Sequence, residues 1–226
     1  MLRKTLLGSI GLFVFASGAE AAFYAGAGLG PEALDFKQQS HIVSFDPAHP
    51  EQGFNVQDNT HLSGTGVFGT IFAGYGHLNG KFYLAGEVNG NLSSSRFKSS
   101  NVEAIRGTSS ASKYEMNDAF GVSILPGFQY SADTLFYARA GYSNAHFKVI
   151  TSDSSLANVS KRLDGFRWGL GIKRAINERF ALRMEYSQVN YNSASMSTLD
   201  PLSGVSKTTK VSPLQQAVEF GLVFTI

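Results

Sequence analysis

Nine residues, Gly165-Phe166-Arg167-Trp168-Gly169-Leu170-Gly171-Ile172-Lys173, alternate strictly between large apolar side chains and glycine or cationic ones. The stretch Phe180-Ala181-Leu182-Arg183-Met184-Glu185-Tyr186-Ser187 repeats this rhythm. Because successive side chains of a β-strand point to opposite faces, the two-residue period predicts strands that separate two different environments. One environment receives the bulky residues, and the other receives the small or charged ones.

Eight segments of the chain have this period, at 22–36, 63–76, 81–96, 113–130, 134–150, 162–174, 179–194 and 209–226. We expect long loops at 37–62, 97–112, 151–161 and 195–208, and short turns at 78–81, 131–133 and 175–178. The pair Asn79-Gly80 predicts a type I′ hairpin turn, which needs positive φ at both central residues. Long and short connections alternate, which predicts an all-β, antiparallel up-and-down meander with all short turns at one end.

Composition favours a membrane barrel over a soluble one. The chain contains 24 glycines and 12% aromatic residues, but only 16% charged residues, against roughly 25% in soluble domains. A soluble barrel would place the bulky face inside, and the remaining face of Gly, Ala and Ser would make a poor water-exposed surface. We therefore expect an eight-stranded antiparallel up-and-down transmembrane β-barrel with its bulky face toward lipid.

The N-terminal segment has the features of a cleaved signal peptide. Arg3 and Lys4 precede an apolar stretch from Leu6 to Phe15, and Ala19-Glu20-Ala21 has small residues at the positions that a signal peptidase reads. We expect a signal peptide at 1–21 and a barrel domain at 22–226. The chain has no cysteine, which excludes disulfides and thiol chemistry, and its net charge of +2 does not favour a nucleic-acid partner.

The face opposite the bulky residues contains charged side chains that a narrow barrel would enclose. They are Glu87, Arg139, Arg167, Lys173, Arg183, Glu185 and Glu219. An eight-stranded barrel has an interior only just filled by side chains, so enclosed charges must pair. We expect an ion-pair network that plugs the lumen; the alternative is a gated, narrow conductance for small solutes, in which the pairs exchange partners.

Aromatic residues recur near the expected strand ends, where a membrane barrel places its interfacial girdles. The candidates are Phe23, Tyr24, Tyr75, Phe82, Phe128, Tyr130, Phe136, Tyr186 and Tyr191.

Three patches resemble the OmpA-like and opacity-type family of outer-membrane barrels. Residues 165–186 resemble the penultimate hairpin of these barrels, Phe23 to Gly30 is similar to their first strand, and Val218 to Ile226 resembles their closing strand. The resemblance implies the outer membrane of a Gram-negative bacterium, with multiple passes and extracellular long loops. It also implies contact with outer-membrane lipid and lipopolysaccharide, and frequent use of the loops in adhesion or invasion.

The closing strand resembles the signal that the barrel assembly machinery reads, through Phe220, Leu222, Phe224 and Ile226. Family members commonly end on Phe, whereas this chain ends on Ile226. We expect no peptidoglycan-binding domain and no function of that kind.

No catalytic, metal-binding or cofactor-binding site is expected. Barrel lipid A deacylases place a His two residues before a Ser that is followed by Asn-Ala; here Ser143-Asn144-Ala145 is present, but Gly141 replaces the His. His146 falls on the opposite face of the strand from Ser143, so it cannot serve as the base. An enzyme that modifies lipid A is the least favoured alternative.

The first long loop is the predicted recognition site, because binding residues often lie on loops of a rigid scaffold. It contains His41, Phe45, Phe54 and His61 with few charges. A host-surface receptor is the expected partner; the alternative is a passive loop that faces lipopolysaccharide.

Overall fold

The computed structural model describes residues 20–44, 53–103, 108–151, 158–199 and 205–226. The described part is built of ten β-strands. They are β1 (Glu20–Ser44), β2 (Phe54–Asn79), β3 (Phe82–Ser93), β4 (Arg96–Glu103), β5 (Thr108–Gln129), β6 (Thr134–Thr151), β7 (Val159–Ala175), β8 (Phe180–Tyr191), β9 (Ala194–Leu199) and β10 (Val205–Thr225). No helix long and apolar enough to cross a membrane occurs within these ranges.

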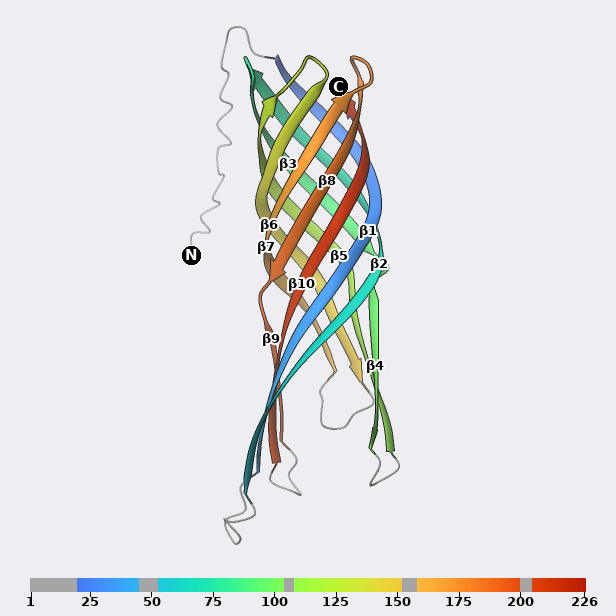
Figure 1. Ribbon diagram of the computed structural model, residues 1–226, viewed down its shortest axis with the longest axis vertical. Helices are drawn as coiled ribbons and strands as arrows, with labels where there is room; N and C mark the ends of the chain where they lie inside the picture. The colour runs from blue at the N-terminus through green and yellow to red at the C-terminus, as the bar shows by residue number, and fades with distance from the viewer. Residues whose placement is uncertain (1–19, 45–52, 104–107, 152–157, 200–204) are drawn as a thin grey trace, which may run out of the picture.

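Eight strands close into an antiparallel ring in the order β1-β2-β3-β5-β6-β7-β8-β10 (Figure 1). The ring is closed by β1 and β10, which pair from Tyr24↔Thr225 to Ser44↔Val205. The other two strands continue ring strands after short breaks, since β4 follows β3 and pairs with β5, and β9 follows β8 and pairs with β10. The predicted eight-stranded up-and-down barrel is confirmed.

Three of the four expected long loops are largely strand. Within 37–62, β1 continues to Ser44 and β2 begins at Phe54; within 97–112 lie β4 and the start of β5, and within 195–208 lie β9 and the start of β10. The prediction of loops in these segments was wrong because their sequences are mostly polar, which removes the apolar alternation but not the backbone pairing. Residues 1–19 of the expected signal peptide are outside the described part, and Glu20 and Ala21 begin β1.

The short turns lie together at the end of the ring where β1 begins and β10 ends (Figure 1). In the first turn Asn79 pairs with Phe82, so Gly80 and Lys81 are the central residues, and Gly80 has a φ of 62°. Glycine at the first central position is typical of a type II′ turn, and the type I′ prediction was wrong by one residue. In the second turn, hydrogen bonds from the Ser131 and Thr134 hydroxyls lower the pKa of Asp133.

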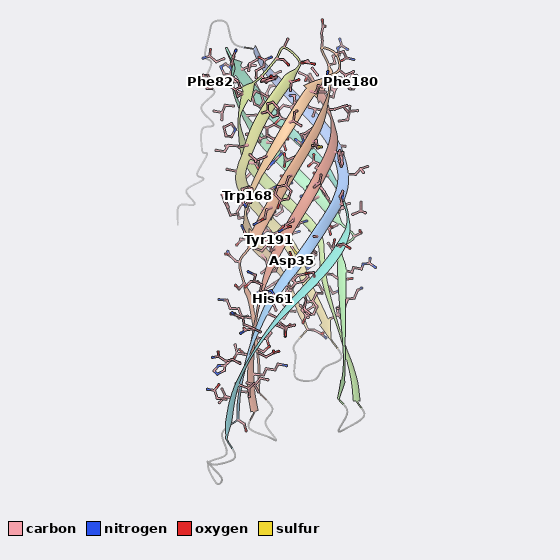
Figure 2. The ribbon with its side chains drawn as sticks, in the orientation of Figure 1. Asp35, His61, Phe82, Trp168, Phe180 and Tyr191 are labelled. Carbon is pink, nitrogen blue, oxygen red and sulfur yellow. The ribbon has the colours of Figure 1, made fainter. Side chains whose placement is uncertain are left out.

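The outer surface of the ring is an apolar belt. Large side chains are freely exposed on neighbouring strands, such as Ile71 at 70%, Phe82 at 73% and Leu92 at 72%. In Figure 2, Phe82 and Phe180 lie at the end of the belt with the short turns, Trp168 lies in its middle, and Asp35 and His61 lie beyond it. A surface of this kind is stable only against hydrocarbon, so the bulky face meets lipid as expected.

Seven of the nine predicted girdle aromatics are on this outer face, but Tyr24 and Tyr191 point into the ring. Tyr24 is 5% exposed and donates a hydrogen bond to Glu87 at 3.0 Å. Tyr191 is buried and donates to Gln215 at 3.1 Å. Phe23 points outward, so the two-residue period places its neighbour Tyr24 inside.

Candidate functional site: the lumen and the extracellular arms

Arg139 of β6 lies in the lumen and joins two carboxylates from different strands. Its Nη2 donates to Glu87 Oε1 of β3 at 2.7 Å and to Glu185 Oε2 of β8 at 2.9 Å. All three side chains are completely shielded from solvent. Because an unpaired buried charge costs several kcal/mol, the three groups depend on one another for their charged state.

Arg183 of β8 extends these contacts to the closing strand. Its Nη1 donates to Glu87 at 2.7 Å, and its Nη2 donates to Glu219 of β10 at 2.5 Å. Arg167 of β7 donates to Glu185 at 3.2 Å. We call these six paired residues the lumen network: Glu87, Arg139, Arg167, Arg183, Glu185 and Glu219. Three acids face three arginines, so the network is neutral.

Lys173, the seventh charge expected in the lumen, lies apart from this network. No carboxylate of the described residues lies within 4 Å of its ammonium. Nζ lies instead 5.1 Å from the centre of the Tyr24 ring and 5.7 Å from that of Tyr83. The two-residue period predicts that Lys173 lies on the inner face, and it does. Its partners belong to other strands, so they could not be predicted from the pattern of its own strand.

Glu32 of β1 is a buried lumen carboxylate that the sequence analysis missed. Ser95 Oγ donates to its Oε1 at 2.8 Å, the Ser93 hydroxyl donates to the same oxygen, and Gln215 Nε2 donates to Oε2 at 2.6 Å. The alternation from Tyr24 along β1 puts Glu32 on the inner face, so the signal was present in the sequence.

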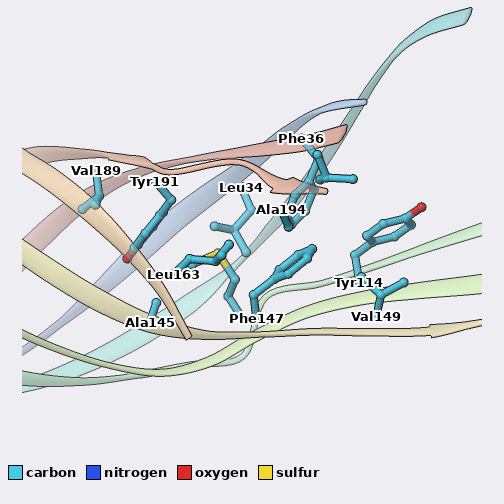
Figure 3. Packing of buried hydrophobic residues seen from close by; sticks show 12 residues of the cluster. Leu34, Phe36, Tyr114, Ala145, Phe147, Val149, Leu163, Val189, Tyr191 and Ala194 are labelled. Carbon is cyan, nitrogen blue, oxygen red and sulfur yellow. The ribbon is translucent and has the colours of Figure 1, made fainter. Parts of the chain in front are cut away.

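A cluster of apolar side chains fills the lumen on the side of the network away from the short turns. We call it the outer plug (Figure 3); its members are Leu34, Phe36, Tyr114, Met116, Ala145, Phe147, Val149, Leu163, Val189, Tyr191, Ala194 and Val211. Phe36 of β1 packs near two aromatic rings from the opposite wall, with ring centroids 5.7 Å from Tyr114 and 6.0 Å from Phe147. A register shift in β5 between Met116 and Ala119 turns Tyr114 and Met116 inward.

A second buried cluster lies nearer the short turns. We call it the inner layer; its members are Tyr24, Phe72, Ala85, Leu125, Tyr137, Ala181 and Val223. Tyr137 also donates to Glu185 at 2.7 Å, which ties this layer to the lumen network. The lumen thus contains an apolar layer, a layer of ion pairs and a second apolar layer in succession.

Beyond the belt, the cylinder divides into two four-stranded sheets, which we call the extracellular arms. The first arm has the order β2-β1-β10-β9, and the second has the order β4-β5-β6-β7. The division begins where β2 stops pairing with β3, at Phe68↔Ser93. Figure 1 shows the β1–β2 hairpin and the β4–β5 hairpin as separate projections.

The residues of the predicted binding loop lie in the first arm, as far as the structure describes them. His41 of β1 and His61 of β2 are exposed, and Phe54 is the first residue of β2. His41 Nε2 is 2.7 Å from Asn55 Oδ1 of the neighbouring strand. Phe45 lies outside the described residues. The predicted site is therefore largely a hairpin of two strands, and not a loop.

The outer part of β2 forms a long edge of the first arm. Segment 54–65 of β2 pairs with β1 throughout and without a register shift, but no described strand pairs with its other side. We call segment 54–65 the open edge. It contains no Lys, Arg or Pro, and Asp58 is its one charged residue.

The residues of the expected assembly signal lie on β10 or directly after it, and the Ser and His of the tested deacylase pattern lie on β6. Phe220, Leu222 and Phe224 of the expected assembly signal face outward on β10, and the Ile226 amide donates to Phe23 O at 2.8 Å. Ser143 is buried beside the Tyr191 hydroxyl at 3.3 Å, whereas His146 lies outside, with Nε2 at 2.9 Å from Ser160 Oγ. No group of three His, Asp or Glu side chains suited to a metal ion occurs in the described ranges.

A family model described as outer membrane protein beta-barrel domain matches residues 5–220. Among solved structures, OprG of Pseudomonas aeruginosa is 12% identical with a TM-score of 0.52, over 90% of this chain and 96% of that chain. Ail of Yersinia pestis is 14% identical with a TM-score of 0.37, over 87% and 99% of the chains. Neisserial surface protein A is 14% identical with a TM-score of 0.39, over 88% and 98%. No curated protein matches the chain.

The family match spans nearly the whole chain and agrees with the closed ring, the apolar belt and the charged lumen. This chain belongs to the family of outer-membrane β-barrel proteins and resides in the outer membrane of a Gram-negative bacterium.

Proposed function

We propose that this protein is a plugged, non-enzymatic barrel that anchors two extracellular arms, and that the first arm binds a protein on another surface, as an adhesin does. The observation that supports this function best is the open edge of β2. It is a long strand segment that no strand of the described ranges pairs on one side, and it extends from a closed ring.

The three layers of the lumen favour a plug over a channel. A water path through the barrel would have to cross the outer plug, where Phe36, Val149 and Val211 are at most 1% exposed. It would also have to separate the buried pairs of Arg139, which leaves uncompensated charges in the lumen. Both steps disfavour the alternative of a small-solute channel.

An enzymatic role has little support in the arrangement of the side chains. Ser143 and His146 are on opposite faces of β6, and His146 has Asp118 and Ser160 as its neighbours. A nucleophile needs its base within hydrogen-bond reach. We therefore prefer the non-enzymatic assignment.

The open edge differs from the other edges of the arms. Natural sheets protect exposed edges with short strands, charged side chains or proline. β9 has only 6 residues, β4 contains Arg96 and Lys98, and the outer part of β7 contains Lys161 and Arg162. Segment 54–65 lacks these features, so its free backbone groups can pair with an added strand. The partner is an extended segment of a protein, with side chains that suit an edge bearing a single negative charge.

The test compares two lysine substitutions on directly paired residues. Asn59→Lys adds a charge on the open edge, and Gln39→Lys adds the same charge on its partner residue in β1, which is already paired on both sides. Bacteria displaying equal amounts of each variant are assayed for binding to cultured host cells. We expect Asn59→Lys to weaken binding about tenfold, equivalent to about 1.4 kcal/mol, and Gln39→Lys to bind like the wild type.

A barrel with residues 45–52 deleted distinguishes the hairpin edge from the connecting segment. Loss of binding in this variant alone, with Asn59→Lys unaffected, would overturn the assignment to the edge. If wild-type cells bind no better than cells without the barrel, the adhesion function itself is wrong.

A further inference from the structure

A cavity at the periplasmic end of the ring lies outside the function proposed above. It has a volume of about 180 Å³ and is lined by residues from the beginning of β1, the end of β10, the turns and the inner face of the barrel. On the same measure, one water needs about 10–15 Å³. We call this cavity the vestibule. Between it and the lumen network only about 10 Å³ remains, lined by Glu87, Tyr137 and Arg183 among others, so the vestibule ends there.

The vestibule contains one cation that forms no ion pair with the described residues. Lys173 lines it and has no carboxylate within 4 Å among the described residues, whereas each arginine of the lumen network has at least one. Its ammonium lies against the rings of Tyr24 and Tyr83. Asp133 also lines the vestibule, but it accepts from Ser131 and Thr134 and pairs with Arg174 at 3.2 Å.

The remaining walls indicate which anion would fit. Gln129 and Thr225 supply side chains that can form hydrogen bonds, while Leu78 and Leu135 contribute apolar surface. A single cation matches a single negative charge, and the apolar walls match a short hydrocarbon body. A phosphate dianion would leave part of its charge uncompensated beside these walls.

We propose that the vestibule is a binding site for a small monocarboxylate from the periplasm. The carboxylate pairs with Lys173, and its short alkyl part lies against Leu78 and Leu135. Such a group reaches the vestibule either as a free acid or as the end of a larger molecule.

The experiment is a titration of the isotope-labelled barrel in lipid nanodiscs, followed by NMR. The probes are butyrate, its neutral analogue butyramide, inorganic phosphate, and a tripeptide with a free C-terminal carboxylate. We expect butyrate to cause saturable shifts at Lys173, Tyr24 and Tyr83, and butyramide to cause none. Saturable shifts with butyrate alone indicate a free acid as ligand, and saturable shifts with the tripeptide as well indicate the end of a peptide.

The control variant is Lys81→Gln, because the Lys81 ammonium also lies over an aromatic ring, 5.9 Å from the centre of Phe128, but outside the vestibule. We expect Lys173→Gln to weaken butyrate binding at least tenfold, Lys173→Arg to retain it within about threefold, and Lys81→Gln to leave it unchanged. If Lys173→Gln folds poorly, Lys173→Arg still tests the site, because it keeps the positive charge and should therefore keep butyrate binding.

Shifts that do not saturate, or that persist in a folded Lys173→Gln variant, would overturn the site. Binding of phosphate as tight as that of butyrate would overturn the assignment to a monocarboxylate.

Discussion

Arg139 and Arg167 are both buried arginines of the lumen network, but they are bonded unequally. Arg139 contacts two carboxylates, whereas Arg167 contacts one carboxylate, Glu185, and the Ser187 hydroxyl. Removing one partner of a buried pair leaves the other charge uncompensated. The loss of free energy of unfolding therefore depends on how many carboxylates the removed arginine contacted.

Arg139→Met should therefore lower the free energy of unfolding by about 3–5 kcal/mol, and Arg167→Met should lower it by less. Arg174→Met is the control, because this side chain is 72% exposed in its pair with Asp133, and exposed pairs contribute about 0–1 kcal/mol. Urea unfolding of the barrel in lipid vesicles measures all three. An Arg139→Met loss as small as that of Arg174→Met would contradict the buried network.

Gly171 provides the space for the Tyr137 ring. A Cβ built at Gly171 would approach the Tyr137 side chain to 2.3 Å, and the hydroxyl of that ring donates to Glu185 at 2.7 Å. At Gly86, on the outer face of β3, nothing lies within 4 Å of such a Cβ. The same substitution thus meets a packed lumen at one glycine and open space at the other.

Gly171→Ala should destabilise the barrel by about 1–3 kcal/mol, because the ring must move in a filled interior. Gly86→Ala should change stability by less than about 0.5 kcal/mol. The same unfolding assay in vesicles compares them, and equal effects of the two substitutions would argue against a filled lumen.

At the scale of elements, the pairing of β1 with β10 turns the sheet into a cylinder. Ala27 and Leu222 are direct partners across this seam, and Leu222 is in turn the partner of Leu182 on β8. The chain contains no cysteine, so an introduced pair can form only one disulfide within the molecule.

Ala27→Cys with Leu222→Cys should form a disulfide under mild oxidation, since paired residues on adjacent strands are close enough to bridge. Ala27→Cys with Leu182→Cys should not, because neighbouring strands are about 4.8 Å apart and this pair is separated by two such steps. Gel mobility of oxidised and reduced protein reports the result. An unlinked first pair in folded protein would mean that the ring is open.

At the scale of the whole molecule, the parts that lipid constrains could be predicted from sequence, and the parts in water could not. The alternation of residues 165–173 predicts the belt and the lumen face because one side of each strand meets hydrocarbon. In the stretch Gln57-Asp58-Asn59-Thr60 both sides meet water, so the strand has no periodic signal even though it pairs with β1 throughout.

The lumen was predictable in composition but not in its contacts. The two-residue period assigns all seven expected charges to the inner face. Six of them form ion pairs there. The isolation of Lys173 and the burial of Tyr114 depend on the stagger between strands and on the register shift in β5, which arise only when all strands are assembled. The open edge likewise exists because β3 ends at Ser93 while β2 continues past it.

The central claim is a closed cylinder whose lumen is filled by the inner layer, the lumen network and the outer plug. Single-channel recording of the purified protein in planar bilayers tests it most directly, with insertion verified by protease cleavage of the exposed arms. We predict no discrete current steps from inserted wild-type protein. Stable, reproducible steps from the inserted wild type would contradict the plugged lumen.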